Sequence, residues 1–391
     1  MTPIDYDAIV VGAGPAGASA AFVLGQAGLR TLMIEQFKLP RDKPCGGGLT
    51  FKVGQALPFD LAPIIERTID TIDLTWRLAR PVTLQSRQPL VYMVSRSRFD
   101  AFLTERAIGT GNVTLIDDCA VESVSLDADR YRVATTQGNY RGRYLVGADG
   151  AKGMVGRALG LMRERRLMPA VEYDVEVDKN TADAWEGRMG IDVGMLRGSY
   201  GWVFPKEGHL NIGVGCFAAA SRLTRRLRQY GIDHLAARLQ SNVRVIKRVG
   251  YVLPLRRPGS AIQQGRALLV GDAAGLVEAF TGEGIYWAIR SGQLAGQAIV
   301  EHIREGAGTG YRDPVYQAVV DRELMPPLLD ARRLAHVYLW CPRSCYTLPK
   351  RSARMRRAIF EILRGESTFT DLTQSRRLGG WLVRRLPQDL A

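Results

Sequence analysis

The chain has 391 residues, of which 46% are hydrophobic, and its 53 lysines and arginines exceed its 39 aspartates and glutamates by a net charge of +14. This length and apolar content exclude a disordered chain and predict two or three folded domains. Five cysteines are too few for a disulfide scaffold, and with four histidines we expect no metal site. We find neither a secretory leader nor an apolar run long enough to span a membrane. The sequence therefore predicts a cytoplasmic protein, or one peripheral on the inner face of a membrane.

The first 35 residues predict a strand, a glycine-rich turn, a helix and a second strand. An apolar run at residues 6–11 leads directly into a G-x-G-x-x-G turn at residues 12–17, and small residues at 18–27 form the helix. The second strand, at residues 30–35, ends in an acid. This order of elements is typical of dinucleotide-binding domains.

The turn fits a bound dinucleotide residue by residue. Gly12 permits the tight turn, Gly14 lets the backbone approach a pyrophosphate, and Gly17 lets the helix pack closely on the strand. Ala16 lies in the same turn, where the helix N-terminus offers free N–H groups to phosphates. Glu35, which follows Gly14 by 21 residues, is placed to accept hydrogen bonds from ribose hydroxyls. The alternative is a glycine turn without a ligand.

Two later strands end in acidic residues, and this selects FAD among the dinucleotides. One strand ends at Asp149-Gly150, and the other, at residues 266–272, ends at Gly271-Asp272. An acid at the carboxyl end of a parallel strand points into the cofactor crevice. We expect Asp272 to bind the ribityl hydroxyls and Asp149 to hold the loop around the diphosphate.

The remaining patterns predict an α/β fold with a Rossmann-like FAD-binding domain, an inserted β-sheet substrate domain and a helical C-terminal region. Helical spacing occurs at residues 99–108 and 275–304. Strand patterns occur at residues 119–150, which alternate as hairpins, and at residues 170–217 and 245–254.

The domains follow from this order of patterns. We place a discontinuous FAD-binding domain at residues 1–165 and 260–305, a β-rich substrate domain at 166–259 with part of 70–98, and a basic helical region at 306–391.

Three further segments carry a resemblance to a known family. They read Lys43-Pro-Cys45-Gly46-Gly47-Gly48, Arg96-Ser-Arg-Phe99-Asp100 and Tyr200-Gly-Trp202-Val-Phe204-Pro205-Lys206. They are similar to the PCGG, RxxFD and YxWxFP segments of the geranylgeranyl reductase family. The resemblance covers roughly residues 5–300 in the same order. PCGG and YxWxFP are its specific part, because flavoprotein hydroxylases share the first turn and the two acidic strand ends.

The resemblance implies roles near the flavin for the PCGG and RxxFD segments. It places Cys45, Gly46 and Gly47 beside the flavin and the substrate, where glycines let the backbone press on a flat ring. It also implies that Arg96 reaches the flavin or its ribityl chain, with Arg98 as the alternative. From the residues alone, Cys45 is equally well a small buried thiol.

The segment Gly282-Glu283-Gly284-Ile285 precedes the helix at residues 286–304. The resemblance implies that its backbone N–H groups and the helix N-terminus lie beside the pyrimidine edge of the flavin. Reduced flavin carries negative charge there, which a helix N-terminus stabilises. Glu283 departs from the family, where a glycine often stands between the other two, and a plain helix start is the alternative.

An aromatic stripe at spacing two predicts one face of a strand that carries Tyr200, Trp202 and Phe204. The resemblance implies that Tyr200 and Trp202 act in the reaction and that Phe204 and Pro205 bind substrate. Aromatic faces suit an apolar isoprenoid and stabilise cationic character at an alkene carbon. The alternative is an ordinary aromatic core.

These features predict an FAD-dependent reductase of C=C double bonds in a geranylgeranyl or related isoprenoid chain, carried by a prenyl diphosphate, a prenylated lipid or a quinone. Hydride transfer from reduced flavin requires a matching protonation, for which Cys45 or an ordered water is the candidate donor. NADPH, reduced ferredoxin or another electron-donor protein would reduce the flavin. A flavin monooxygenase of the hydroxylase type is the main alternative. A flavin-bound RNA-binding protein is the second alternative. We find no RNA-binding module in the sequence, so we expect no nucleic acid partner.

Half of the net charge lies in residues 340–391, which hold eleven lysines or arginines and four acids. Basic and large apolar residues mix there, a pattern typical of a helix lying on an anionic membrane surface. The mixed stretches are Arg351, Arg354, Arg356 and Arg357 around Met355, Ala358, Ile359 and Phe360, and Arg384 and Arg385 beside Trp381, Leu382 and Val383. The alternative is a solvated helix packed on the body of the protein.

Overall fold

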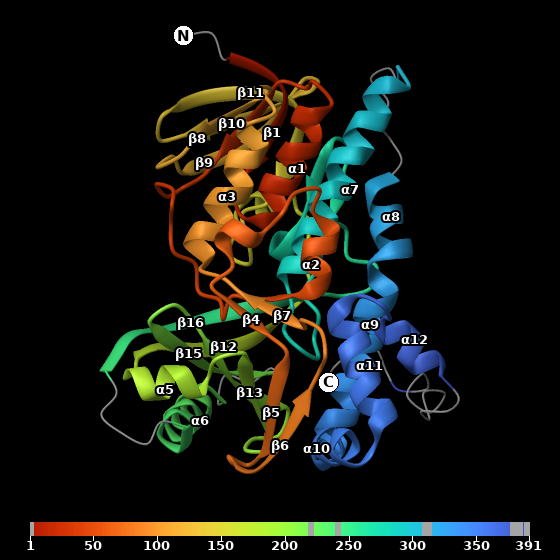
Figure 1. The fold of residues 1–391 in the computed structure, drawn as a ribbon. Helices are drawn as coiled ribbons and strands as arrows, with labels where there is room; N and C mark the ends of the chain where they lie inside the picture. The colour runs from red at the N-terminus through yellow and green to blue at the C-terminus, as the bar shows by residue number, and fades with distance from the viewer. Residues whose placement is uncertain (1–3, 218–222, 239–243, 307–314, 376–385, 387–391) are drawn as a thin grey trace.

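The computed structural model describes residues 4–217, 223–238, 244–306, 315–375 and 386. Figure 1 shows a sheet flanked by helices in the upper half, a second sheet in the lower half, and the C-terminal helices along one side of both.

The upper sheet is built around parallel strands whose carboxyl ends are level. Its strands are β1 (Ile4–Val11), β2 (Thr31–Ile34), β8 (Val113–Ile116), β9 (Val121–Asp127), β10 (Arg130–Thr135), β11 (Gly138–Gly147), β17 (Gln263–Gln264) and β18 (Ala267–Leu269). The main order is β17-β18-β11-β1-β2-β8, and the β9–β10 hairpin extends the sheet from β11. Val11 is level with both Ile34 and Gly147, and Gly147 with Leu269. The segments that follow these strands therefore meet at one edge.

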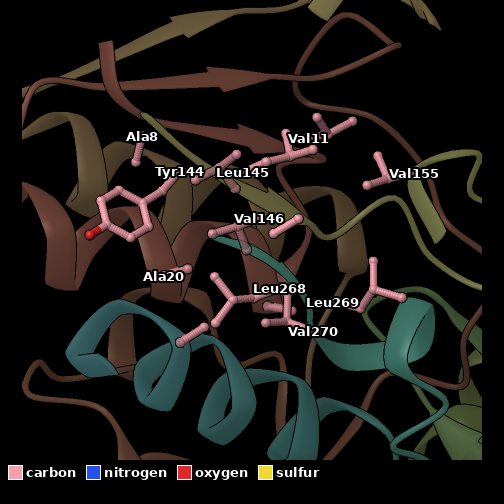
Figure 2. Close-up of a cluster of buried hydrophobic side chains, with 14 of the residues drawn as sticks. Ala8, Val11, Ala20, Tyr144, Leu145, Val146, Val155, Leu268, Leu269 and Val270 are labelled. Atoms are coloured by element: carbon pink, nitrogen blue, oxygen red, sulfur yellow. The ribbon is translucent and has the colours of Figure 1, made fainter. Parts of the chain in front are cut away.

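Helices α1 (Pro15–Gln26), α3 (Arg96–Ile108) and α7 (Ile285–Arg304) lie against this sheet. The contact between α1 and α7 needs a glycine, because a β carbon on Gly292 would overlap the carbonyl oxygen of Ala16. Between helices and sheet lies a core of apolar side chains, part of which Figure 2 shows. Burial of this core fixes the helices and the sheet as one unit.

The lower sheet is mostly antiparallel. Its strands are β5 (Thr71–Trp76), β6 (Ala79–Gln85), β12 (Arg165–Glu176), β13 (Arg188–Val193), β14 (Ser199–Pro205), β15 (His209–Cys216) and β16 (Arg244–Arg256). Their order is β16-β12-β15-β14-β13-β5-β6, in which only the β13–β5 pair is parallel. Helices α5 (Lys179–Ala184) and α6 (Leu223–Arg238) lie beside this sheet in Figure 1.

Shorter elements connect the two sheets. A three-stranded sheet has the order β3-β7-β4. The elements are β3 (Gly48–Thr50), α2 (Phe51–Ala56), the 3-10 helix η1 (Ala62–Ile64), β4 (Arg67–Ile69), β7 (Val91–Met93), α4 (Val155–Ala158) and the 3-10 helix η2 (Gly271–Ala274).

The predicted α/β fold class is confirmed, and two element bounds differ from the sequence prediction. The strand predicted at 266–272 is wrong beyond Leu269, because Gly271 has a φ of +56° and turns the chain into η2. The helix predicted from Phe99 already begins at Arg96, so the RxxFD segment is helical. The domain boundaries stay predictions.

The C-terminal helices pack on the lower sheet and on α2. They are α8 (Val315–Glu323), α9 (Met325–Trp340), α10 (Pro342–Arg351), α11 (Ala353–Arg364) and α12 (Phe369–Gln374). On α11, Ile359, Phe360 and Leu363 pack against a buried cluster that includes Ile69 and Leu84. These apolar side chains therefore face the protein, as the alternative of a packed helix expects.

Membrane contact through residues 340–391 stays a prediction, but Ile359 and Phe360 do not provide a free apolar face for it. The mixed stretch from Trp381 to Arg385 lies outside the described residues. Within the described ranges, no helix is long and apolar enough to cross a membrane.

We expect Phe369→Ala to destabilise the fold, because Phe369 is 5% exposed and meets the Phe280 ring edge-on at 6.0 Å. Removing a buried phenylalanine ring costs about 3 kcal/mol in unfolding free energy, which urea unfolding of the full chain measures. The matched control is Phe37→Ala, because Phe37 is 54% exposed. Equal losses in both variants would contradict the packing of α12.

Candidate active site

The segments after four parallel strands meet at one edge of the upper sheet. They carry Gly12 after β1, Glu35 after β2, Asp149 after β11, and Gly271-Asp272 after β18. The Glu35 carboxylate accepts the backbone N–H of the residue after Gly12 at 2.9 Å. Residues that the sequence assigned to one cofactor site therefore lie at the same edge.

The glycine turn between β1 and α1 has no room for side chains. Gly12 has a φ of +105°, and a β carbon on Gly17 would overlap the Gly12 carbonyl oxygen. Gly14 directly precedes the first residue of α1. A β carbon on Gly271 would lie 2.9 Å from the β carbon of Ala16. This cradle of bare backbone at a helix N-terminus fits the pyrophosphate of a dinucleotide.

A buried chain of charges lies beside the turn. Arg41 is 3.4 Å from the Glu35 carboxylate and 2.7 Å from the Asp100 carboxylate, and a β carbon on Gly14 would lie 3.6 Å from its guanidinium. Arg96 donates two hydrogen bonds of 2.8 Å to Asp100. Burial disfavours both charges, but their mutual attraction prevails, so the pKa of Asp100 is lowered and the pKa of Arg96 is raised. Sequence reasoning missed Arg41 as a cofactor neighbour, because its loop position carries no pattern.

The two acids at this edge have different surroundings. Asp149 Oδ2 accepts the Val155 N–H at 2.8 Å, whereas its buried Oδ1 has no hydrogen-bond partner among the described residues. Burial raises the pKa of Asp149. Asp272 Oδ2 is 3.7 Å from Lys43 Nζ and accepts from Tyr251 Oη at 3.5 Å. A buried acceptor without a partner and a second acid beside it fit a cofactor that brings hydroxyl donors.

The start of α7 reaches both the acidic edge and the PCGG segment. A β carbon on Gly284 would lie 3.6 Å from Asp272 Oδ1. Ile285, the first residue of α7, belongs to a buried cluster against which Cys45 packs. The residues that the resemblance placed around the flavin are therefore neighbours.

The PCGG segment is held between the two halves of the molecule. The Cys45 N–H donates to Glu172 Oε1 on β12 at 2.9 Å, and the Gly47 N–H donates to Cys45 Sγ at 3.3 Å. A β carbon on Gly46 would lie 2.8 Å from the Phe204 ring on β14. Only a residue without a side chain fits there.

The aromatic stripe of β14 is present as predicted. The ring centroids of Tyr200 and Trp202 are 6.0 Å apart, and those of Trp202 and Phe204 are 6.2 Å apart. Tyr200 also stacks on Phe217 at 5.7 Å. Pro205 is buried at the end of β14. The stripe forms a wall beside the PCGG segment.

The wall is tied to the loop before α7. Tyr200 Oη donates to the Thr281 carbonyl at 2.6 Å, and a β carbon on Gly282 would lie 2.5 Å from the same Oη. The Glu278 carboxylate accepts the Thr281 N–H at 3.1 Å. Burial raises the pKa of Glu278 to about 7. A buried acid thus shapes the loop that carries Gly282 and Gly284.

Two buried ionisable groups behind the wall escaped sequence reasoning. Lys206 Nζ donates to the Val94 carbonyl at 2.8 Å, beside Gly47, and burial lowers the pKa of Lys206 to about 8. Burial, with help from Asp174, raises the pKa of Glu172 to about 7. Lys206 directly follows the YxWxFP segment, whereas nothing in the strand pattern distinguishes Glu172 from a solvent-facing acid.

Two residues whose roles the sequence left open, Arg98 and Glu283, form ion pairs with other residues. Arg98 lies 3.4 Å from the exposed Glu207, so Arg96 is the arginine in the buried chain of charges. Glu283 forms an ion pair of 2.6 Å with Lys52.

Comparison with known proteins identifies the family of the chain. Residues 5–318 match a family model described as an FAD binding domain. The geranylgeranyl diphosphate reductase of Synechocystis sp. is 32% identical over 315 residues, which cover 76% of this chain and 76% of that protein. Digeranylgeranylglycerophospholipid reductase 1 of Methanopyrus kandleri is 30% identical over 354 residues, which cover 85% and 91% respectively.

Solved structures share the fold. A geranylgeranyl bacteriochlorophyll reductase-like protein from Thermoplasma acidophilum has a TM-score of 0.74 at 22% identity and covers 97% of this chain and 96% of its own. The flavin-dependent brominase Bmp2 has a TM-score of 0.76 at 19% identity, with 97% of both chains covered. The fold therefore serves flavoenzymes of different activities, and only the site distinguishes them.

The fold and the cradle at its edge define an FAD-dependent oxidoreductase. The chain belongs to the FAD-binding domain family, and within it is related to the geranylgeranyl reductases at about 30% identity.

We expect Gly17→Ala to weaken FAD binding, because the new β carbon would overlap the Gly12 carbonyl oxygen and displace the turn. A loss of about tenfold in affinity corresponds to ~1.4 kcal/mol, and flavin absorbance per protein after dialysis measures it. Gly54→Ala is the control, because its β carbon would have 4.0 Å of clearance within α2. Retention of FAD by Gly17→Ala would contradict the assignment of the turn.

We expect Glu172→Gln to change how stability depends on pH. Burial raises the Glu172 pKa from 4.5 to about 7, so the folded state keeps a proton that the unfolded chain releases. Glu172 therefore costs stability as the pH rises through that interval. The unfolding free energy of Glu172→Gln minus that of the wild type should increase from pH 4.5 to 7 and then level off.

The control for this titration is Glu176→Gln, an exposed acid on the same strand. Urea unfolding over the pH range measures both differences. A difference for Glu172→Gln that does not vary with pH would contradict the burial of this carboxyl.

Proposed function

We propose that the protein is an FAD-dependent reductase that saturates carbon–carbon double bonds of a geranylgeranyl or related isoprenoid chain. The observation that carries the proposal is the contact between the PCGG segment and β14, where Gly46 lies against Trp202 and Phe204. The two segments most specific to the reductases are thus in contact. Relatives named geranylgeranyl diphosphate reductase and digeranylgeranylglycerophospholipid reductase 1 support this substrate class.

The cofactor would be held by bare backbone and by acids at the carboxyl edge of the upper sheet. We assign it Gly12, Gly14, Ala16, Gly17, Glu35, Gly46, Gly47, Arg96, Asp149, Gly271, Asp272, Gly282, Gly284 and Ile285. Bound and reduced by NADPH or ferredoxin, FAD supplies the hydride.

The β14 wall would hold the substrate. Aromatic faces give an apolar chain a dry surface, and their π electrons favour the positive charge that builds on the tertiary carbon during protonation. Tyr200 and Trp202 are assigned to the reacting bond, because one holds the loop before α7 and the other touches Gly46. Phe204 and Pro205 are assigned to the rest of the chain.

A proton must reach the second alkene carbon. Cys45 Sγ accepts the Gly47 N–H at 3.3 Å, and the thiol interacts electrostatically with the buried Arg96 guanidinium. This places a thiol at the junction of the wall and the proposed flavin site. The donor is therefore Cys45 or an ordered water that Cys45 positions.

The direct test uses the purified FAD-loaded protein, reduced with dithionite under anaerobic conditions. Addition of geranylgeranyl diphosphate or a geranylgeranylated glycerophospholipid should reoxidise the flavin and add two hydrogens per double bond, as mass spectrometry measures. Failure of both prenyl substrates to reoxidise the flavin and to gain two hydrogens per double bond would leave the hydroxylase alternative. That outcome would contradict the proposal.

We expect Cys45→Ala to lower turnover about 100-fold, the lower range for loss of a general acid, while the FAD content changes little. Cys341→Ala, an exposed cysteine, is the matched control. Single-turnover flavin reoxidation measures the rate. Turnover unchanged in Cys45→Ala would exclude the thiol from proton delivery.

A further inference from the structure

Two large apolar side chains are exposed on α9 and α10, one at the end of α9 and one near the end of α10. Trp340 is 73% exposed and Leu348 is 47% exposed. Trp340 is fixed in place, because the Arg197 guanidinium lies 5.0 Å from its ring centroid and donates to the Leu339 carbonyl at 3.1 Å. Exposed apolar residues that occur singly are common, so these two gain meaning only from the charges of the same segment.

The helix that carries Leu348 is anchored through its other face. Tyr346 and Pro349 are buried, and Tyr346 Oη donates to the Arg80 carbonyl at 2.6 Å. Leu348 thus stays at the surface while α10 remains attached to the lower sheet.

The segment that carries these two residues is strongly basic. Residues 331–360 contain eight lysines or arginines and no acid. Three of them, Arg343, Lys350 and Arg351, are exposed on α10. We call Trp340, Leu348 and these three cations the docking corner. A second copy of the chain would present the same cations, so self-association through this corner would bring like charges together.

The helix that ends in Trp340 packs toward the β14 wall. Tyr338, one helical half-turn before Trp340, meets Phe217 edge-on at 5.4 Å and accepts the Gly194 N–H at 3.2 Å. Phe217 in turn stacks on Tyr200 at 5.7 Å. The buried side of α9 therefore connects to the proposed substrate wall through Tyr338 and Phe217.

We propose that the docking corner binds the surface of an anionic lipid bilayer, an inference that rests on the proposed function because it supplies the enzyme with a lipid-borne prenyl chain. Tryptophan prefers the membrane interface, the leucine enters the apolar layer, and the cations pair with lipid phosphates. This surface differs from the apolar face of α11, which packs on the protein.

The test measures flotation of the FAD-loaded full chain with vesicles. Vesicles of equal phosphatidylcholine and phosphatidylglycerol should bind the protein, and phosphatidylcholine vesicles should not. Trp340→Ser with Leu348→Ser should lower the partition coefficient about tenfold. Replacing Arg343, Lys350 and Arg351 by glutamine should lower it about fivefold for each cation removed.

Control variants remove an exposed leucine or three exposed cations elsewhere. Leu126→Ser removes a leucine that is 60% exposed on β9. Glutamine at Arg225, Arg226 and Arg228 removes three exposed cations from α6. Equal losses in the control and corner variants, or undiminished binding by the corner variants, would overturn the proposal.

Fluorescence provides a second readout. Quenching by brominated phosphatidylglycerol should be stronger in the wild type than in Trp340→Phe, and equal quenching would contradict membrane contact by this ring.

Sedimentation must show the same mass for the wild type and Trp340→Ser/Leu348→Ser, since a dimer lost in the variant would assign the corner to a second copy. The corner variants should keep wild-type reduction of soluble geranylgeranyl diphosphate. Vesicle binding without any prenyl reduction would contradict the proposed function and leave the docking corner standing.

Discussion

The site depends on the absence of side chains at Gly46 and Gly47. A β carbon on Gly46 would lie 2.8 Å from the Phe204 ring, and one on Gly47 would overlap the Val94 carbonyl oxygen. Because the backbone fits into this gap, the Cys45 N–H reaches Glu172, which lies 127 positions away in the sequence. The glycine cradle of the upper sheet and the aromatic wall of the lower sheet thereby become two sides of one site. Neither half alone brings the glycine cradle and the aromatic wall together.

Charge is distributed in two different ways around this site. Near the cradle, Arg41 and Arg96 are both paired with the buried Asp100 carboxylate. Behind the wall, burial brings the pKa of Glu172 to about 7 and that of Lys206 to about 8. Strongly shifted groups gather at functional sites, and Glu172 and Lys206 both lie beside the PCGG segment. The exposed cations of α10 belong to neither set and give the chain its basic end.

The features that depend on local sequence could be predicted. The glycine turn, Glu35 after β2 and the stripe from Tyr200 to Phe204 follow from spacing, since backbone geometry sets period and turn type. The strand predicted through Gly271 was too long. The sequence shows that residue 271 is a glycine, but it does not show whether that glycine has a positive φ or an extended backbone. The Arg41–Asp100 pair and the position of Glu172 depend on long-range contacts. Ile359 and Phe360 show a further limit, because an amphipathic helix has the same pattern whether it packs on protein or on lipid.

The most direct test of this single site is a crystal structure of the FAD-loaded protein with a geranylgeranyl ligand. The isoalloxazine should contact Gly46, Gly47 and the segment Gly282 to Ile285, and the prenyl chain should lie on Tyr200, Trp202 and Phe204. A flavin that contacts the glycine turn at residues 12–17 but not the PCGG segment, or a prenyl chain bound away from β14, would contradict the account.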